Sequence, residues 1–272
     1  MLGISSSGRL LSSGPFGYHH PIDYMVKSFF DCAGITNEIQ KQAINHLLYN
    51  LLDAGLLGKI VALYPMIGGT AVSHSYNLVD TKNYNLTFYG GWTHSDTGAK
   101  PNGINGYADT GLKSLSPSLT YNGRNENRHL SYYANTTSNN AELLIGVYNG
   151  GNGYEIIFPN NGGASHMANG SYQNSTIPLS NKGFFCTSML INDTSFGVSL
   201  VGNKIYEMTG LIPFGPVDLT YYIGAWNLSN TPTFYASASC AFSSIGIGLS
   251  VDEILKLNEI VNQFQVTLNR AI

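Results

Sequence analysis

Charged side chains are scarce in this sequence. Asp, Glu, Lys and Arg make up 11% of the 272 residues, whereas an ordinary soluble domain contains about 25%. The 13 Lys and Arg residues are scattered and the net charge is −3. We therefore expect no nucleic-acid partner, because phosphate binding needs clustered cations. Asn, Ser, Thr, Tyr and Gly supply the polarity instead, which is typical of a shell, a fibre or a sugar-facing sandwich.

Long apolar runs and paired cysteines are also missing. No stretch approaches the roughly 18–20 continuous apolar residues of a membrane helix, so we expect no membrane partner. Residues 1–10 lack the basic head and apolar run of a secretory signal, and we expect synthesis in the cytoplasm without a signal peptide. Cys32, Cys186 and Cys240 are odd in number and widely spaced, which predicts buried free thiols.

The first 58 residues predict an extended arm followed by two helices. Residues 1–20 are rich in Ser and Gly and show no periodicity. Pro21 suits the first turn of a helix that Gly34 ends, and Thr36 is the expected N-cap of a second helix that ends at Gly55. Residues 21–58 thus form a helical segment with one continuous apolar face, made of Ile22, Met25, Val26, Phe29, Phe30, Ala33, Ile39, Ala43, Ile44, Leu47, Leu48, Leu51 and Leu52.

From about residue 59 the sequence becomes strand-like. Short runs rich in β-branched and aromatic residues alternate with Gly- and Asn-rich turns. No internal repeat is visible, which disfavours a propeller or a solenoid. The pattern predicts an antiparallel two-sheet jelly roll over about 59–249. The expected strands are 59–64, 84–89, 118–121, 142–148, 154–158, 184–191, 196–201, 204–206, 219–225 and 235–242.

A final helix is predicted over residues 250–272. Ser250 and Glu253 have the spacing of a capping box, in which each side chain accepts a hydrogen bond from the other residue's backbone N–H. The apolar residues that follow recur at spacings of three and four. We expect this stripe to pack on the sandwich; a self-association seam is the alternative. The stripe consists of Ile254, Leu257, Val261, Phe264 and Leu268.

Catalytic and cofactor signatures are absent from the pattern. No expected strand has acids at i and i+2, the arrangement that would place a glycosidase pair on one face, and Asp252 and Glu253 belong to a helix cap. No Gly-x-Ser-x-Gly elbow, phosphate-binding glycine loop or zinc-ligand spacing occurs. His19 and His20 are interpreted as polar surface of the arm. We expect a protein that is not an enzyme, with no cofactor and no metal.

Two groups of residues leave room for a binding site. Asp96, Asn102, Asn105 and Asp109 lie in loop-like, glycine-containing sequence that could hold calcium, although a hydrogen-bonded turn is the expectation. Trp92 and Trp226 could stack on sugars, although each follows a Gly-containing strand end and is expected in the core. The sequence shows no cluster of aromatic residues that is expected to be exposed.

Several segments resemble virion proteins of tailed phages that infect gut Bacteroidetes, including the crAss-like group. The resemblance is strongest in residues 54–78, in 88–94 (FYGGWTH), in 102–109 (NGINGYAD) and at the end, where AFSSIGIGLS at 241–250 precedes the last helix and the terminal NRAI. It covers roughly residues 22–272. The closing strand, the Ile-Gly step and the capped helix are also similar to the ending of laminin-G-like, concanavalin A-like sandwiches.

This resemblance implies a concanavalin A-like jelly roll at residues 59–272 that serves as a structural virion component, such as a head fibre, a decoration protein or a tail-associated protein. It implies no catalytic residue, and its lectin-like fold suggests contact with host surface glycans during adsorption. Residues 1–20 would anchor the protein to other virion proteins, and we expect a homo-oligomer, with a trimer favoured. The alternative function is a glycan-binding, lectin-like module. The missing aromatic cluster favours the structural role.

Overall fold

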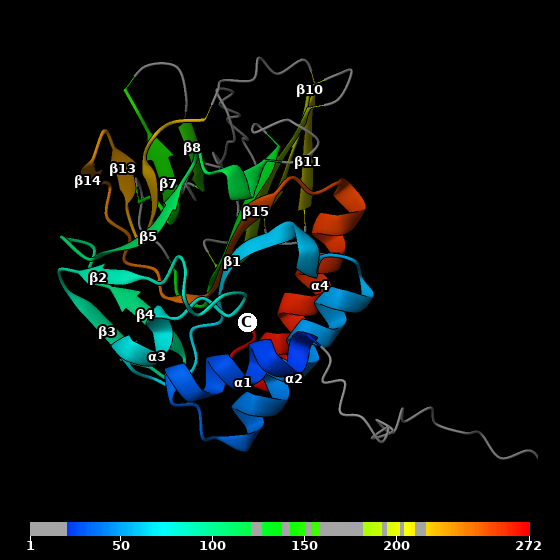
Figure 1. Ribbon diagram of the computed structural model, residues 1–272. Coiled ribbons are helices and arrows are strands. Elements are labelled where there is room, and N and C mark those ends of the chain that lie inside the picture. Colours follow the sequence, from blue (N-terminus) through cyan, green and yellow to red (C-terminus); the bar gives the residue numbers. More distant parts are fainter. Residues whose placement is uncertain are drawn as a thin grey trace, which may run out of the picture.

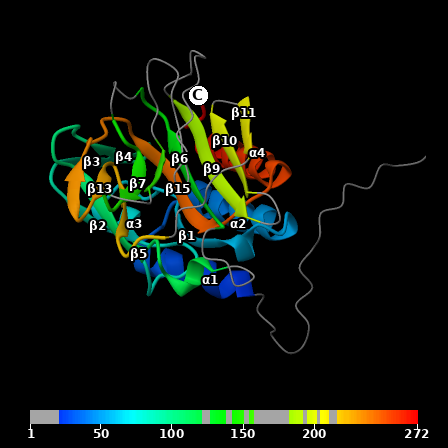
Figure 2. The same cartoon turned by 90° about the horizontal axis from the view of Figure 1, so that it is seen from above.

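The computed structural model describes residues 21–120, 127–137, 142–150, 154–157, 182–191, 195–201, 204–209 and 216–272. The arm expected at residues 1–20 lies outside these ranges. Two β-sheets are stacked face to face, and helices cover the outer face of one of them (Figure 1). Figure 2, seen from above, shows α2 (Glu38–Asp53) and α4 (Val251–Thr267) beside the strands β9 (Gly183–Ile191) and β10 (Ser195–Val201) and away from β13 (Trp226–Leu228). The fold is therefore a three-layer arrangement of helix, sheet and sheet.

The first sheet, sheet A, contains eight described strands. Seven of them follow the spatial order β11-β10-β9-β6-β15-β4-β3, and β1 pairs with β15. Every pairing in this sheet is antiparallel. The strands are β1 Ile60–Tyr64, β3 Trp92–Ser95, β4 Gly98–Pro101, β6 Arg128–Ala134, β9 Gly183–Ile191, β10 Ser195–Val201, β11 Lys204–Thr209 and β15 Cys240–Ile247.

The second sheet, sheet B, contains seven described strands in the order β14-β13-β7-β12-β5-β2, with β8 paired to β7. Its pairings are antiparallel except for β13 and β7, which run parallel. These two stacked sheets confirm the expected mainly β, two-sheet jelly-roll sandwich. The strands are β2 Thr87–Tyr89, β5 Tyr107–Lys113, β7 Ile145–Tyr148, β8 Tyr154–Ile157, β12 Thr220–Ile223, β13 Trp226–Leu228 and β14 Thr231–Thr233.

The helices confirm most of the expected boundaries. The first two are α1, Pro21–Ala33, and α2, Glu38–Asp53; a short α3, Ala71–Ser75, was not expected. The N-cap of α2 is Asn37 rather than Thr36, because the Asn37 side chain accepts hydrogen bonds from the N–H groups of Ile39 and Gln40. The last helix, α4, spans Val251–Thr267, and both hydrogen bonds of the Ser250–Glu253 capping box are formed.

Three strand predictions need correction. Residues 117–119 form a 3-10 turn, because Pro117 follows the capping side chain of Ser116, and no strand begins at 118. Only residues 87–89 of the expected strand at 84–89 are extended, and the strand expected at 235–242 begins at Cys240. The patterns missed β3, β4, β5, β6, β13 and β14 altogether.

A first core fills the space between the two sheets. Inward-facing residues of both sheets are almost fully buried there, and Leu130, Tyr132 and Ala134 of β6 alternate with residues that face the helices. Other members include Ala108, Leu112, Ile145, Val147, Phe185, Tyr221, Ile223, Ala238 and Ile245.

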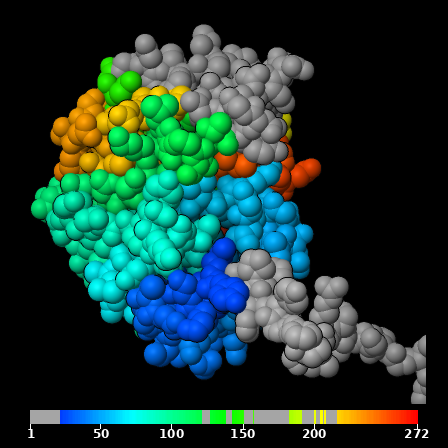
Figure 3. Space-filling view, in the orientation of Figure 1, coloured from blue at the N-terminus to red at the C-terminus, as the bar shows by residue number. Residues whose placement is uncertain are grey.

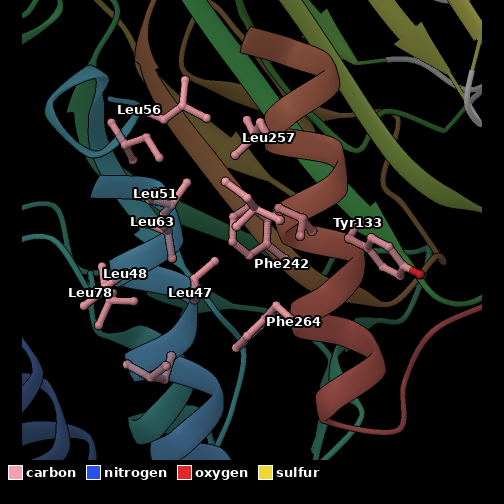
Figure 4. Packing of buried hydrophobic residues seen from close by; sticks show 14 of the residues in the cluster. Leu47, Leu48, Leu51, Leu56, Leu63, Leu78, Tyr133, Phe242, Leu257 and Phe264 are labelled. Carbon is pink, nitrogen blue, oxygen red and sulfur yellow. The ribbon is translucent and has the colours of Figure 1, made fainter. Parts of the chain in front are cut away.

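A second core lies between sheet A and the helices. Phe242 projects from sheet A between Phe264 of α4 and the leucines of α2, and Tyr133 of the same core lies on the other side of α4 (Figure 4). The Phe242 and Phe264 rings meet edge to face with centroids 6.3 Å apart. The stripe of α4 is buried here, so the self-association alternative for that face is wrong. The buried leucines of α2 are Leu47, Leu48 and Leu51.

The N-terminal helices also contact the chain near β2. Ser28 of α1 shares a hydrogen bond with Thr81, with 2.7 Å between the hydroxyl oxygens. The space-filling view shows the blue residues of α1 lying directly against the cyan residues that follow β1 (Figure 3). The helical segment is thus packed on the sandwich as expected. None of the described helices is long and apolar enough to cross a membrane.

The C-terminus is fixed by a buried arginine. The guanidinium of Arg270 donates hydrogen bonds to the carbonyl oxygens of Met66 at 2.7 Å, Ala241 at 3.0 Å and Pro65 at 3.2 Å, and to Gln265 Oε1 at 2.9 Å. Burial lowers the pKa of Arg270 to about 10, so the side chain stays charged at neutral pH. These bonds join the end of α4 to β15 and to the loop after β1.

The cysteines are free, as expected, but only two are buried. Burial raises the pKa of the Cys186 thiol far above its usual value and that of Cys240 to about 12. Cys32 lies near the end of α1 and is exposed, so the expectation of burial is wrong there.

Candidate functional site

The outer face of sheet B carries a group of aromatic side chains. In β5, Ala108 and Leu112 point into the inter-sheet core, so the alternation of a strand turns Tyr107 and Asp109 outward. Strand pairing sets Tyr89 opposite Tyr107, and Tyr222 opposite Asp109. We call this surface the aromatic face; its aromatic residues are Tyr89, Tyr107, Tyr148, Tyr222 and Trp226.

Three tyrosines form a continuous row across β2, β5 and β12. The rings of Tyr89 and Tyr107 are stacked, with centroids 4.9 Å apart and planes 15° from parallel, and Tyr107 lies 4.7 Å from Tyr222. Tyr89 ends the row and is 45% exposed, whereas Tyr222 is buried within it. Because the inner ring faces are turned toward one another, Tyr89 is the member best placed to stack on a ligand.

Burial and neighbouring charges keep the phenols of Tyr107 and Tyr222 protonated. Burial raises the pKa of Tyr222 to about 12, with further contributions from the Asp109 carboxylate and the neighbouring phenols. Burial likewise raises the pKa of Tyr107, and Tyr89, Asp109 and Tyr235 add to the shift. The phenols of Tyr107 and Tyr222 are therefore neutral at physiological pH, and each can both donate and accept a hydrogen bond.

A second aromatic group lies on β7 and β13. Trp226 stacks on Tyr148 with centroids 5.0 Å apart and planes 9° from parallel. Phe234, which follows β14, tilts against Trp226 at 5.7 Å and is 48% exposed. Its φ of 53° lies in the left-handed region, which costs a non-glycine residue free energy and persists only where the surrounding structure requires it. The contacts with Tyr148 and Phe234 place Trp226 on the aromatic face and not in the core, contrary to expectation.

Trp92 supports the strands that carry the tyrosine row but is not part of the row. Its indole N–H donates to the backbone carbonyls of Tyr89 at 3.1 Å and Tyr107 at 3.2 Å, and its ring packs against the inter-sheet core. A Cβ on Gly224, where φ is 83°, would lie 3.0 Å from the Trp92 ring. The expectation of a core role is confirmed for Trp92, which supports the strands that carry the tyrosines.

The positions and hydrogen bonds of Asp96, Asn102, Asn105 and Asp109 do not support the calcium alternative. Asn102 Oδ1 accepts the N–H groups of residues 104, 105 and 106, and Asn105 Oδ1 accepts the N–H of Gly91, so the hydrogen-bonded turn is confirmed. Asp109 lies in β5 instead of a loop, and Asp96 lies in the turn between β3 and β4. Within the described residues, no three His, Cys, Asp or Glu side chains converge on a position for a metal ion.

A serine–histidine contact exists, but it is inaccessible. His129 Nδ1 donates to the carbonyl of Ile247 at 2.8 Å, which leaves Nε2 to accept from the Ser244 hydroxyl at 3.2 Å. Both residues are fully buried between sheet A and the helices. Burial lowers the pKa of His129 to about 4. The pair is a structural hydrogen-bond network, because no substrate could reach the hydroxyl.

Two further histidines meet beside α3. The Nδ1 atoms of His74 and His94 are 2.9 Å apart, which requires one ring to donate and the other to accept. Burial lowers the pKa of His74 to about 3 and also lowers that of His94. His74 belongs to α3 and His94 to β3 of sheet A, so neither histidine lies on the aromatic face.

The expectation that no aromatic cluster is exposed is therefore wrong. The residues of the aromatic face come from strands separated by up to about 140 positions in the sequence, and only the sheet pairing brings them together. A local signal did exist, since FYGGWTH and NGINGYAD contain Tyr89 and Tyr107. Nothing in those segments shows that the two rings share one face.

Comparisons with known proteins give the following likenesses. No family model matches the chain, and no curated protein matches it. Among solved structures, the chain is similar to domain 4 of AbnA, a GH43 extracellular arabinanase from Geobacillus stearothermophilus in complex with arabinotriose. That likeness has 12% identity, covers 75% of this chain and 98% of that one, and has a TM-score of 0.46.

Two sialidases also provide similar structures. For the CBM40 of the Ruminococcus gnavus IT-sialidase, the identity is 14%, the coverage is 59% of this chain and 96% of that one, and the TM-score is 0.41. For the NanB sialidase from Streptococcus pneumoniae, the identity is 17%, the coverage is 47% of this chain, and the TM-score is 0.37. The chain spans about a quarter of the NanB chains that it matches, 24% and 23%.

Proposed function

We propose that this protein is a non-enzymatic jelly-roll sandwich that binds glycans through the aromatic face of sheet B. The observation that carries the proposal is the tyrosine row, which ends in the half-exposed ring of Tyr89 and continues in protonated phenols. An exposed aromatic ring offers an apolar surface to the C–H side of a sugar, and phenol groups exchange hydrogen bonds with its hydroxyls. The second group, with Phe234 at its exposed end, extends the same surface.

The wider setting that we propose is a phage particle. The virion resemblance of residues 22–272 and the low charge of the chain favour a head fibre, a decoration protein or a tail-associated protein. In that setting the aromatic face would contact host surface glycans during adsorption, and residues 1–20 would hold the protein in the particle. The homo-oligomer, with a trimer favoured, belongs to the same proposal.

A glycan array with the full-length protein tests the binding function. The wild type should bind a subset of glycans, and Tyr89→Ala and Phe234→Ala should each reduce that binding by about three- to tenfold, since an aromatic contact contributes on the order of 0.5–1.5 kcal/mol beyond its buried area. Tyr24→Ala is the matched control, because Tyr24 is 63% exposed on α1. Absence of glycan binding, or equal binding by Tyr89→Ala and Tyr24→Ala, would refute the proposed site.

Deletion of residues 1–20 separates the two parts of the proposal. The truncated protein should bind the same glycans as the full chain but should fail to enter phage particles. Normal incorporation of the truncated protein would refute the anchoring role and leave the aromatic face unaffected.

A further inference from the structure

The aromatic face contains an acidic group, Asp109, that has no cationic partner among the residues the structure describes. Asp109 lies in β5 beside Tyr107 and opposite Tyr222. One carboxylate oxygen accepts the N–H of Gly111 at 2.9 Å, and within the described part of the chain Asp109 makes no ion pair. Its carboxylate is close enough to contribute to the raised pKa of both neighbouring phenols.

Cations are nearly absent from the same sheet. Among the described strands of sheet B, the only Lys or Arg is Lys113, at the far end of β5. Its ammonium group lies 2.9 Å from the Asp218 carboxylate, which balances its charge. Arg128, the arginine nearest in sequence among the described residues, is buried between the sheets, where it donates to Ser114.

An anionic sugar would meet an unfavourable field on this surface. The carboxylate of a sialic acid or a uronic acid needs a cation or several N–H donors, whereas the tyrosine row offers phenols and the carboxylate of Asp109. Like charges a few ångströms apart repel, and a binding site often rejects a competing ligand through such a group. Neutral sugar hydroxyls, by contrast, can donate to Asp109 and exchange hydrogen bonds with the phenols.

We infer that the aromatic face selects neutral, hydroxyl-rich glycans and that Asp109 excludes sialylated and uronic acid-containing ones. This inference rests on the proposed function and adds the ligand class to it. Asp109 acts as the specificity-determining residue, because its oxygen remains an acceptor for uncharged sugars while its charge repels acidic sugars. The aromatic rings contribute to binding of both classes and do not distinguish between them.

The experiment compares matched pairs of glycans on one array. Neutral oligosaccharides, such as lactose-terminated chains and unsubstituted xylan fragments, are printed beside their α2,3-sialylated and glucuronic acid-substituted counterparts. The wild type should bind the neutral member of a pair at least about tenfold more tightly at low salt, and the ratio should fall as the ionic strength rises. Asp109→Asn keeps a side-chain oxygen to accept the N–H of Gly111 and should reduce the ratio several-fold.

Asp53→Asn is the matched control, since it makes the same change in net charge at an exposed position at the end of α2. It should leave the ratio unchanged. Wild-type binding that favours the acidic member of the pairs would overturn the selectivity and leave the proposed function standing. A ratio that is equal in the wild type and Asp109→Asn would refute the role of Asp109, and binding to no glycan would refute both proposals.

Discussion

In both sheets, alternate side chains of each strand point to the outer face. The outer face of sheet A is covered by helices, whereas the outer face of sheet B remains partly exposed. The outer face of sheet A presents Phe184, Phe242 and Tyr133, and α2 and α4 cover it. The outer face of sheet B presents tyrosines and Trp226, and it keeps half-exposed rings at Tyr89 and at the neighbouring Phe234. Burial of phenylalanine rings removes apolar surface from water, whereas tyrosine rings can pack against one another and still present hydroxyls to water. The difference separates a face that the helices bury from a face that stays partly exposed.

The strongest test of this comparison removes one ring from each face. Phe242→Ala leaves a cavity in the helix-covered core and should lower the free energy of unfolding by about 4 kcal/mol, as large-to-small core substitutions do. Tyr89→Ala removes a ring that is 45% exposed and should cost less than about 1 kcal/mol. Urea unfolding of both variants measures the contrast. Equal losses would show that the aromatic face is as important to stability as the covered face.

A second test concerns how the covering helix is held. Arg270→Met retains most of the apolar stem but leaves the carbonyls of Pro65, Met66 and Ala241 without this donor. Since each buried unsatisfied group costs on the order of 1–3 kcal/mol, partly relieved by relaxation, we expect a total loss of about 3 kcal/mol. Lys256→Met on the exposed side of α4 is the control and should change little. A loss below about 1 kcal/mol would mean that the terminus is not fixed by these bonds.

The covered face was largely predictable from the sequence. Helix periodicity and caps are local signals, so α1, α2 and α4 and their buried stripes follow directly from the pattern. The central strand β6 was missed because its helix-facing side carries His129 and Ser131. Polar residues on a buried face are stable only when the partner strand supplies hydrogen bonds, here from β15, and such partners cannot be read from one segment.

The aromatic face was much less predictable. Its members lie far apart in the chain, and Asp109 was taken as a loop residue because glycines flank its segment. In the structure, Gly111 has a φ of 64° within β5, where the register with β12 shifts, so this glycine marks an irregular strand and not a loop. Non-local pairing decided which rings meet, and a pattern based on neighbouring residues does not contain that information.

The smallest expected effect is a change with pH in the free energy of unfolding, which should come from the helix-covered face of sheet A and not from the aromatic face. His129 stays neutral in the helix-covered layer, and its folded pKa of about 4 lies well below the usual 6.5. The unfolded chain therefore binds a proton more readily, so the contribution of His129 to stability is complete above pH 6.5 and is lost as the pH falls toward 4. On the aromatic face, the phenols of Tyr107 and Tyr222 have raised pKa values and do not titrate in this range.

Between pH 7.5 and pH 5, His129 alone should account for a loss of about 2 kcal/mol in the free energy of unfolding, since each pKa unit corresponds to about 1.4 kcal/mol. His74 and His94 add to the loss in every variant that retains them. Urea unfolding at both pH values measures the fall in the free energy of unfolding between pH 7.5 and pH 5. For His129→Asn this fall should be about 2 kcal/mol smaller than for the wild type. His46→Asn, at an exposed position on α2, is the control and should keep the full loss. If His129→Asn loses as much stability as the wild type, the acid sensitivity of the covered face does not come from this buried ring.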